Sequence, residues 1–134
     1  MPDIRPDVEE LYMALLEDLG WTDTILPEDM DPDDPDDLPI IIIQRDGGGG
    51  ISADGLNDIA HLFVSVIGKD REHARDILQE CTRRILNDGD QYNLGDWHIE
   101  RALEMTGDAP VGDYNPYRTI RDAMFTIRVS LRFD

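Results

Sequence analysis

The stretch Ala123-Met124-Phe125-Thr126-Ile127-Arg128-Val129-Ser130-Leu131-Arg132-Phe133 alternates between two kinds of side chain. Apolar residues occupy every odd position, and all but one of the even positions are polar or basic. Successive side chains of a strand point to opposite faces, so this pattern predicts a long strand with one core face and one basic face. Such a strand, placed last, has to pair with strands formed earlier in the chain.

Earlier stretches predict the strands that can pair with it. Pro39–Arg45 contains four consecutive isoleucines, which indicates a strand covered on both faces. Asp46–Gly50 is expected to end that strand in a mobile, Gly-rich turn over residues 46–50. Leu56–Ile67 alternates with no cleanly polar face in its second half, which is typical of a central strand.

A further strand is predicted over Trp97–Met105, although its Ala, Leu, Glu and Met content would also suit a helix. Its apolar face would carry Trp97, Ile99, Leu103 and Met105, with Arg101 among them. Gly107–Tyr117 is rich in Pro, Gly, Asn and Asp and is predicted as a loop before the final strand, Thr119–Phe133.

Two segments have the apolar spacing of helices. The first begins at Pro6 and Asp7, and Gly20 is its stop signal, after which Trp21 is expected to pack against the sheet. Asp70 can cap the second helix, which ends near Gly89. The apolar stripes of the two helices contain Val8, Leu11, Leu15 and Leu19, and Ala74, Ile77, Leu78, Cys81 and Ile85.

The predicted order is α-β-β-α-β-β in a single domain over residues 1–134. Two helices on one face of a mostly antiparallel sheet would use all the apolar stripes, which defines an α+β fold. Only one helix lies between strands, so the connections disfavour a doubly wound parallel sheet.

Charge is the most unusual property of the chain, with 30 acidic and 12 basic residues and a formal net charge of -18. This balance opposes direct binding of DNA phosphates and fits a DNA-mimicking surface or a passage that should not hold DNA. Residues 22–38 are predicted to form an acidic loop. Its candidate lumen- or partner-facing residues are Asp29, Asp31, Asp33, Asp34, Asp36 and Asp37.

Basic residues cluster near the end of the chain. Arg121, Arg128 and Arg132 are candidate subunit-interface residues, and Arg128 shares a strand face with Arg132. This face could be solvated and paired with local carboxylates, or it could contact the acidic surface of a neighbouring subunit. The residues leave both alternatives open.

No convincing catalytic set is present, so we expect a protein that is not an enzyme and needs no cofactor or metal. The glycine run continues as Ile51-Ser52-Ala53-Asp54, without the Lys and Ser or Thr of a phosphate-binding loop. His73 and Cys81 are about 12 Å apart along their helix, beyond hydrogen-bond reach. Cys81 is the only cysteine, which favours a reducing compartment, and Pro39–Ile43 is too short an apolar run for a membrane span.

The whole layout resembles the tail terminator proteins of long-tailed bacteriophages, which are also called minor tail or tail completion proteins. The resemblance covers nearly the full chain. Four segments carry it: Asp7–Leu11, Leu38–Arg45, Phe63–Ala74, where a strand runs directly into a helix, and Ala123–Arg132.

The resemblance implies a homo-oligomeric, hexameric ring at the head–tail neck of the virion, assembled in the host cytoplasm. Such a ring caps the tail tube protein, ends tube polymerisation and meets a head-completion or connector protein, while genomic DNA passes through the lumen without specific binding. No membrane partner is implied. The rival interpretations are another connector ring of the phage neck and a free acidic inhibitor that mimics DNA.

Overall fold

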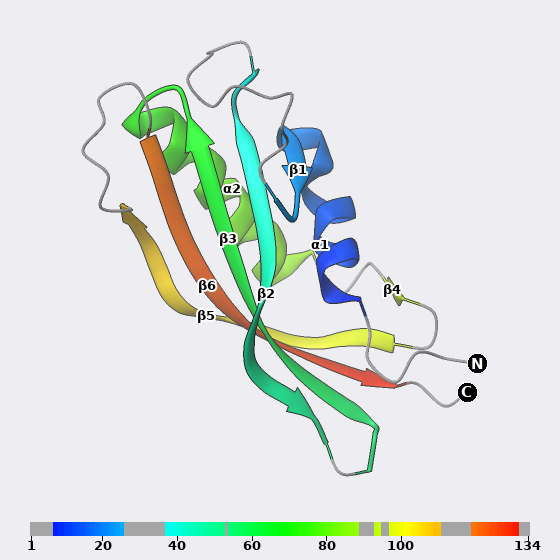
Figure 1. Ribbon diagram of the computed structural model, residues 1–134. Helices are drawn as coiled ribbons and strands as arrows, with labels where there is room; N and C mark the ends of the chain where they lie inside the picture. The colour runs from blue at the N-terminus through cyan, green and yellow to red at the C-terminus, as the bar shows by residue number, and fades with distance from the viewer. Residues whose placement is uncertain are drawn as a thin grey trace.

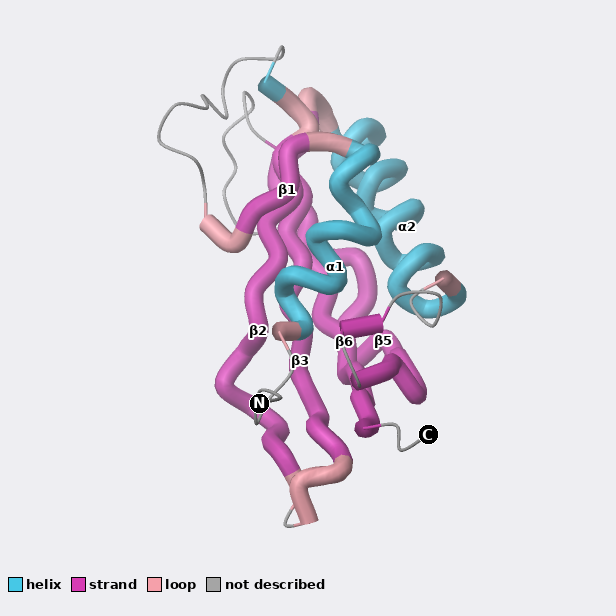
Figure 2. The backbone as a smooth tube through the Cα atoms, turned by 90° about the vertical axis from the view of Figure 1, so that its right-hand side faces the viewer, coloured by secondary structure: helices cyan, strands magenta, loops and turns pink. Residues whose placement is uncertain are grey.

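The computed structural model describes residues 7–25, 37–52, 54–88, 93–94, 97–110 and 119–131. Within these residues the chain folds as two layers, a mixed six-stranded sheet and two α-helices that lie on one of its faces (Figures 1 and 2). This arrangement confirms the predicted α+β fold. The elements are α1 (Val8–Leu16), η1 (Glu17–Leu19), β1 (Trp21–Asp23), β2 (Ile40–Ile51), β3 (Asn57–Gly68), α2 (Arg71–Asn87), β4 (Asn93–Leu94), β5 (Trp97–Pro110) and β6 (Thr119–Leu131).

The strand order is β1-β2-β3-β6-β5-β4, so the last strand of the chain lies in the middle of the sheet. All pairings are antiparallel except that of β1 with β2, which is parallel. The odd positions of β6 point into the core as predicted, with Phe125 and Ile127 fully buried. Residues 132–134 lie outside the described part of the chain.

The core lies between the sheet and the helices. α1 buries Val8, Leu11, Tyr12, Leu15 and Leu16 in it, and α2 buries Ala74, Leu78, Cys81 and Ile85. Both helices begin at capping aspartates. Asp7 accepts a hydrogen bond from the Glu10 backbone at 3.0 Å, and Asp70 accepts one from the His73 backbone at 2.8 Å. The capping prediction at Asp70 is therefore confirmed.

Gly68 is required where β3 runs directly into α2. A Cβ at this position would lie 2.6 Å from the backbone nitrogen and 2.7 Å from the Cα of Ala74. These are backbone atoms, which can give way only if α2 shifts. We therefore expect Gly68→Ala to lower the free energy of unfolding by about 1–3 kcal/mol in urea titrations. The neighbouring exposed variant Lys69→Ala should stay within about 0.5 kcal/mol of the wild type. Equal effects of the two would contradict this account.

The prediction of a loop over the whole of residues 22–38 was wrong at its start. Thr22 and Asp23 belong to β1, whose three residues are too few to show a periodic pattern in the sequence. Trp21 pairs with Ile40 at the edge of the sheet and remains 48% exposed, rather than packing onto the sheet. Residues 26–36, with Asp29, Asp31, Asp33, Asp34 and Asp36, lie outside the described residues, whereas Asp37 is described and half-buried.

The expected Gly-rich turn over residues 46–50 was also wrong, because β2 continues through it to Ile51. The register with β3 shifts between Asp46 and Gly49, so the glycines accommodate a bulge within the strand. The reversal of the chain follows at Ser52–Leu56, where Gly55 adopts a φ of 73°. The resulting hairpin extends beyond the helical layer (Figures 1 and 2).

β5 is confirmed as a strand, but its faces were partly wrong. Its register with β6 shifts between Ile99 and Arg101, which reverses the alternation beyond that point. Trp97 and Ile99 are buried as predicted, whereas Leu103 is 46% exposed on the other face. β5 also continues to Pro110, into the stretch predicted as a loop, and the short β4 was not predicted.

Candidate functional site: the helix-free face of the sheet

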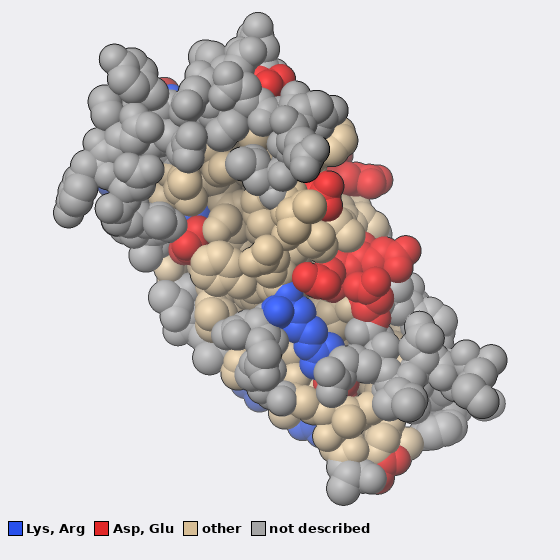
Figure 3. All heavy atoms as spheres, viewed as in Figure 1, with Lys and Arg blue, Asp and Glu red and all other residues tan. Residues whose placement is uncertain are grey.

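The face of the sheet opposite the helices is largely uncharged at its centre. In Figure 3 the described atoms of this face are mostly tan, with a group of Lys or Arg side chains just below the centre and acidic side chains gathered on the side where α1 lies. Phe63 of β3 lies opposite Met124 of β6 there, and both are half-buried. Ile59 and Leu103 are 40% and 46% exposed. These apolar side chains lie among polar ones such as Ser65 and Thr126, and their exposure makes the face a candidate contact surface.

A polar cluster lies at one end of this face and joins three strands. Arg128 Nε of β6 lies 3.0 Å from Glu100 Oε2 of β5. The Ser130 hydroxyl lies 2.6 Å from Glu100 Oε2 and 2.6 Å from Asn57 Oδ1. One hydroxyl donates a single hydrogen, so we assign it to the carboxylate, with the Asn57 side chain as its other neighbour.

The Ser130 hydrogen bond, aided by the Arg128 charge, lowers the pKa of Glu100 below its usual value. Glu100 therefore stays ionised and holds Arg128, which is half exposed, in place. An ion pair this exposed adds little to stability, and its greater use is to fix the position of a charged side chain.

Arg101 adds a second exposed positive charge to this end of the sheet. It lies directly opposite Arg128 across the β5–β6 ladder and is exposed. Within the described residues Arg101 forms no ion pair, so the two arginines face a single carboxylate, Glu100. Sequence reasoning treated Arg101 only as an interruption of an apolar face. A charge that breaks the alternation of a strand is a signal of a bulge that turns it outward.

Arg121, Arg128 and Arg132 are not brought together. Arg121 lies opposite Val66 on the helix-side face and is only 9% exposed, so it does not share a surface with Arg128. The predicted partnership of Arg128 with Arg132 involves a residue outside the described part of the chain. Of the candidates, Arg128 is the described one that is exposed on the helix-free face.

Asp122 is a carboxylate in the apolar part of the face. It accepts a hydrogen bond from Ser65 across the β3–β6 ladder. Desolvation raises its pKa above the usual value, and the Ser65 hydrogen bond only partly opposes this effect. Its ionised form therefore costs folding free energy.

We expect Asp122→Asn to stabilise the fold slightly at pH 7. The free-energy cost of ionised Asp122 is complete above its folded-state pKa, which is raised. This cost disappears below the unfolded-state pKa of Asp122. The stability gain should therefore shrink as the pH falls through this window, as measured by thermal unfolding at several pH values. Asp76→Asn, at an exposed position of α2, serves as a surface control. A gain that grows on acidification would contradict the assignment.

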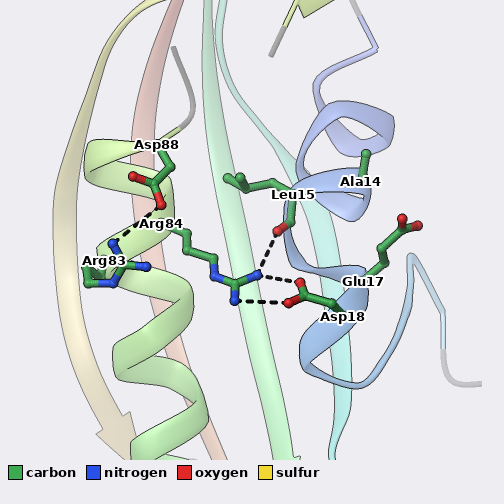
Figure 4. A pocket seen from close by; sticks show the side chains of 7 residues that line it. All are labelled: Ala14, Leu15, Glu17, Asp18, Arg83, Arg84 and Asp88. Atoms are coloured by element: carbon green, nitrogen blue, oxygen red, sulfur yellow. Dashed lines mark hydrogen bonds and ion pairs between the residues drawn. The ribbon is translucent and has the colours of Figure 1, made fainter. Parts of the chain in front are cut away.

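A pocket of about 410 Å³ lies on the other side of the molecule, between α1–η1 and α2 (Figure 4). Arg84 crosses it and donates to the Asp18 carboxylate and, at 3.2 Å, to the Leu15 carbonyl. Glu80 accepts from both Arg83 and Arg84, which together hold its pKa at about 2. These guanidinium groups are occupied by carboxylates, so the contacts tie the two helices together rather than offer an anion site.

The residues with catalytic or metal-binding chemistry remain apart. β6 separates the strands of His61 and His98, so these two histidines do not lie on neighbouring strands. Cys81 is buried, which raises the pKa of its thiol to about 12, and His73 accepts a hydrogen bond from the Lys69 backbone. In the described residues no group of three or more His, Cys, Asp or Glu side chains could hold a metal ion. None of the described helices is long and apolar enough to cross a membrane.

The chain is thus a two-layer α+β domain with one exposed, weakly charged sheet face. No protein-family model matches its sequence, and no curated protein matches it. Among solved structures, it is similar to a chain of a structure described as "Virion of native gene transfer agent (GTA) particle". The TM-score is 0.62 at 13% identity, and the match covers 92% of this chain and 87% of that chain. At this identity the likeness concerns the fold.

Proposed function

We propose that this protein is a structural component of a phage-like virion. The observation that carries the proposal is the fold likeness to a chain of a gene transfer agent virion, which extends over 92% of this chain and 87% of that one. Nearly full-length agreement in both directions means that few elements are added or missing. The exposed Ile59 and Leu103 of the helix-free face support the proposal, because a protein built for assembly needs a contact surface.

More specifically, the chain forms a ring, hexameric as in tail terminators, that caps the tail tube and ends its polymerisation. The ring joins the tail to the head-completion complex at the neck. The element order and the final strand support this role through their resemblance to that family. The net charge of -18 also suits a lumen through which DNA slides without binding to carboxylate-lined walls.

An acidic DNA-mimic inhibitor is the second candidate function. It is favoured by the same net charge, and residues 7–19 contain five acidic residues and no basic one. Such a protein would be monomeric or dimeric and would bind a basic nuclease or repressor. Another connector ring of the neck would share the symmetry of a terminator but would bind different partners.

Quantitative mass spectrometry of purified particles tests the proposed function. A terminator should be present at one ring per particle and should appear by cryo-EM at the top of the tail, between the tube and the head-completion protein. A connector ring would lie closer to the portal. Absence of the protein from washed particles, together with tight binding to a DNA-binding enzyme, would reject the virion role.

A further inference from the structure

Two separate surfaces of the molecule are complementary in charge. The helix-free sheet face carries Arg101 and Arg128 against Glu100 at one end. In the helical layer, Glu10, Ala14 and Glu17 are exposed and follow each other at intervals of four and three residues. This spacing places them on one side of α1 and η1, where they form an acidic stripe.

The acidic character of the helical layer belongs to α1 and not to α2. Residues 69–88 contain five basic and five acidic residues, so the segment with α2 is balanced. Arg83 and Arg84 are, moreover, engaged by Glu80, Asp18 and Asp88. The acidic stripe of α1 is therefore the part of this layer that can accept arginines from another molecule.

The edges of the sheet are poor contact surfaces by comparison. Glu9 Oε2 accepts the Arg45 backbone N–H at 3.1 Å, and the Gln44 side chain donates to the Thr24 carbonyl at 2.8 Å, so α1 and the end of β1 cover this part of the β2 edge. β5, at the other side, is interrupted by three register shifts. Bulges and covering groups are the devices by which proteins prevent edge-to-edge pairing. Assembly through a face is therefore the better supported mode.

We propose that the helix-free face of one copy, anchored by Ile59, Arg101 and Leu103, docks onto the acidic stripe of α1 in a second copy. This inference rests on the proposed ring. The exposed Leu103 and Ile59 supply apolar contact area, and Ala14 leaves space between the two glutamates. Arg101 meets those glutamates, so each contact pairs opposite charges.

The contact is head-to-tail because its two halves are different surfaces of the same molecule. A heterologous contact of this kind generates a ring when the rotation between copies closes. A two-fold contact between two sheet faces would instead bring the arginine-bearing ends of both copies into one interface. It would also stop at a dimer and leave the α1 stripes unused.

Cysteine cross-linking tests this geometry. Leu103→Cys and Ala14→Cys place thiols on the two proposed surfaces, and native Cys81 is buried. After assembly with tail-tube subunits and treatment with a short bismaleimide, mixing the two single variants should give covalent dimers. The Leu103→Cys/Ala14→Cys double variant should give a ladder that ends at the closed ring. The control is the double variant Leu103→Cys/Arg75→Cys, whose second thiol lies at an exposed position of α2. It should give no ladder.

The outcomes separate the inference from the proposed function. Dimers formed by Leu103→Cys alone would show a two-fold sheet contact and overturn the head-to-tail inference. A ring that forms without cross-links between positions 103 and 14 would overturn it as well while leaving the ring proposal intact. Native mass measured before cross-linking detects the other case: if no assembly exists, both the ring and its contact are rejected.

Discussion

Replacing Asp58 by Ala is expected to lower the free energy of unfolding by about 3–5 kcal/mol. The side chain of Asp58 is 0% exposed, and its two oxygens lie 2.7 and 2.8 Å from the Arg45 guanidinium. Arg45 is itself only 16% exposed and also donates to the Ile59 carbonyl. Removal of the carboxylate would leave a largely buried positive charge without its partner, on the helix side of the β2–β3 pair. Urea unfolding followed by circular dichroism measures the loss.

The matched control removes both charges. Arg45→Met combined with Asp58→Leu leaves no unpaired charge, and buried ion pairs replaced by apolar residues are often neutral or stabilising. The double variant should therefore recover most of the stability lost in Asp58→Ala. A single variant as stable as the wild type, or a double variant less stable than Asp58→Ala, would contradict the assigned role of the pair.

The double variant Arg101→Glu/Arg128→Glu is expected to raise the concentration for half-assembly by about 100-fold or more, because repulsion between like charges at an interface costs several kcal/mol and 1.4 kcal/mol is tenfold. Both side chains are exposed on the helix-free face, so their reversal should leave the fold intact. Light scattering over a concentration series with tail-tube subunits measures assembly. Thermal unfolding monitors the fold.

Arg71→Glu/Arg75→Glu is the charge-matched control for this variant, because it also replaces two exposed arginines by glutamate. It adds negative charge to the exposed side of α2, away from both proposed surfaces, and should assemble nearly as the wild type does. If the control and the sheet-face variant assembled equally well, the helix-free face would not be the contact between copies. If both failed equally, net charge rather than position would govern assembly.

The parts of the fold that were predictable are those in which side-chain chemistry follows one period over many residues. In β6 the apolar odd positions continue from Ala123 to Val129, and each of them is buried. In α2 the stripe of Ala74, Leu78, Cys81 and Ile85 is uninterrupted after a capping Asp70. Both patterns report directly on burial, so periodicity was sufficient.

The parts that were not predictable depend on backbone contacts or on register. β1 has three residues, and it forms because the backbone at Trp21 reaches the edge of β2 beside Pro39. The glycine run has no side chains to mark its faces, so a bulged strand and a turn look alike in sequence.

The shift between Ile99 and Arg101 reversed the faces of β5 and placed Arg101 beside Arg128. Only one of the two arginines of the candidate contact surface could therefore be predicted from the sequence. Arg128 could be found by alternation along one strand, whereas Arg101 joins it only once the bulge is known. Strand register is a tertiary property, and a slip of one residue exchanges the two faces.

The native mass of the purified chain, measured with and without tail-tube subunits, tests the central claim most directly. The proposed ring predicts a single assembly of fixed stoichiometry when tube subunits are present, at six times the 15.2 kDa of the chain for a hexamer. Association of that ring with the end of the tube would identify the terminator role. A persistent 15.2 kDa monomer under both conditions would contradict it.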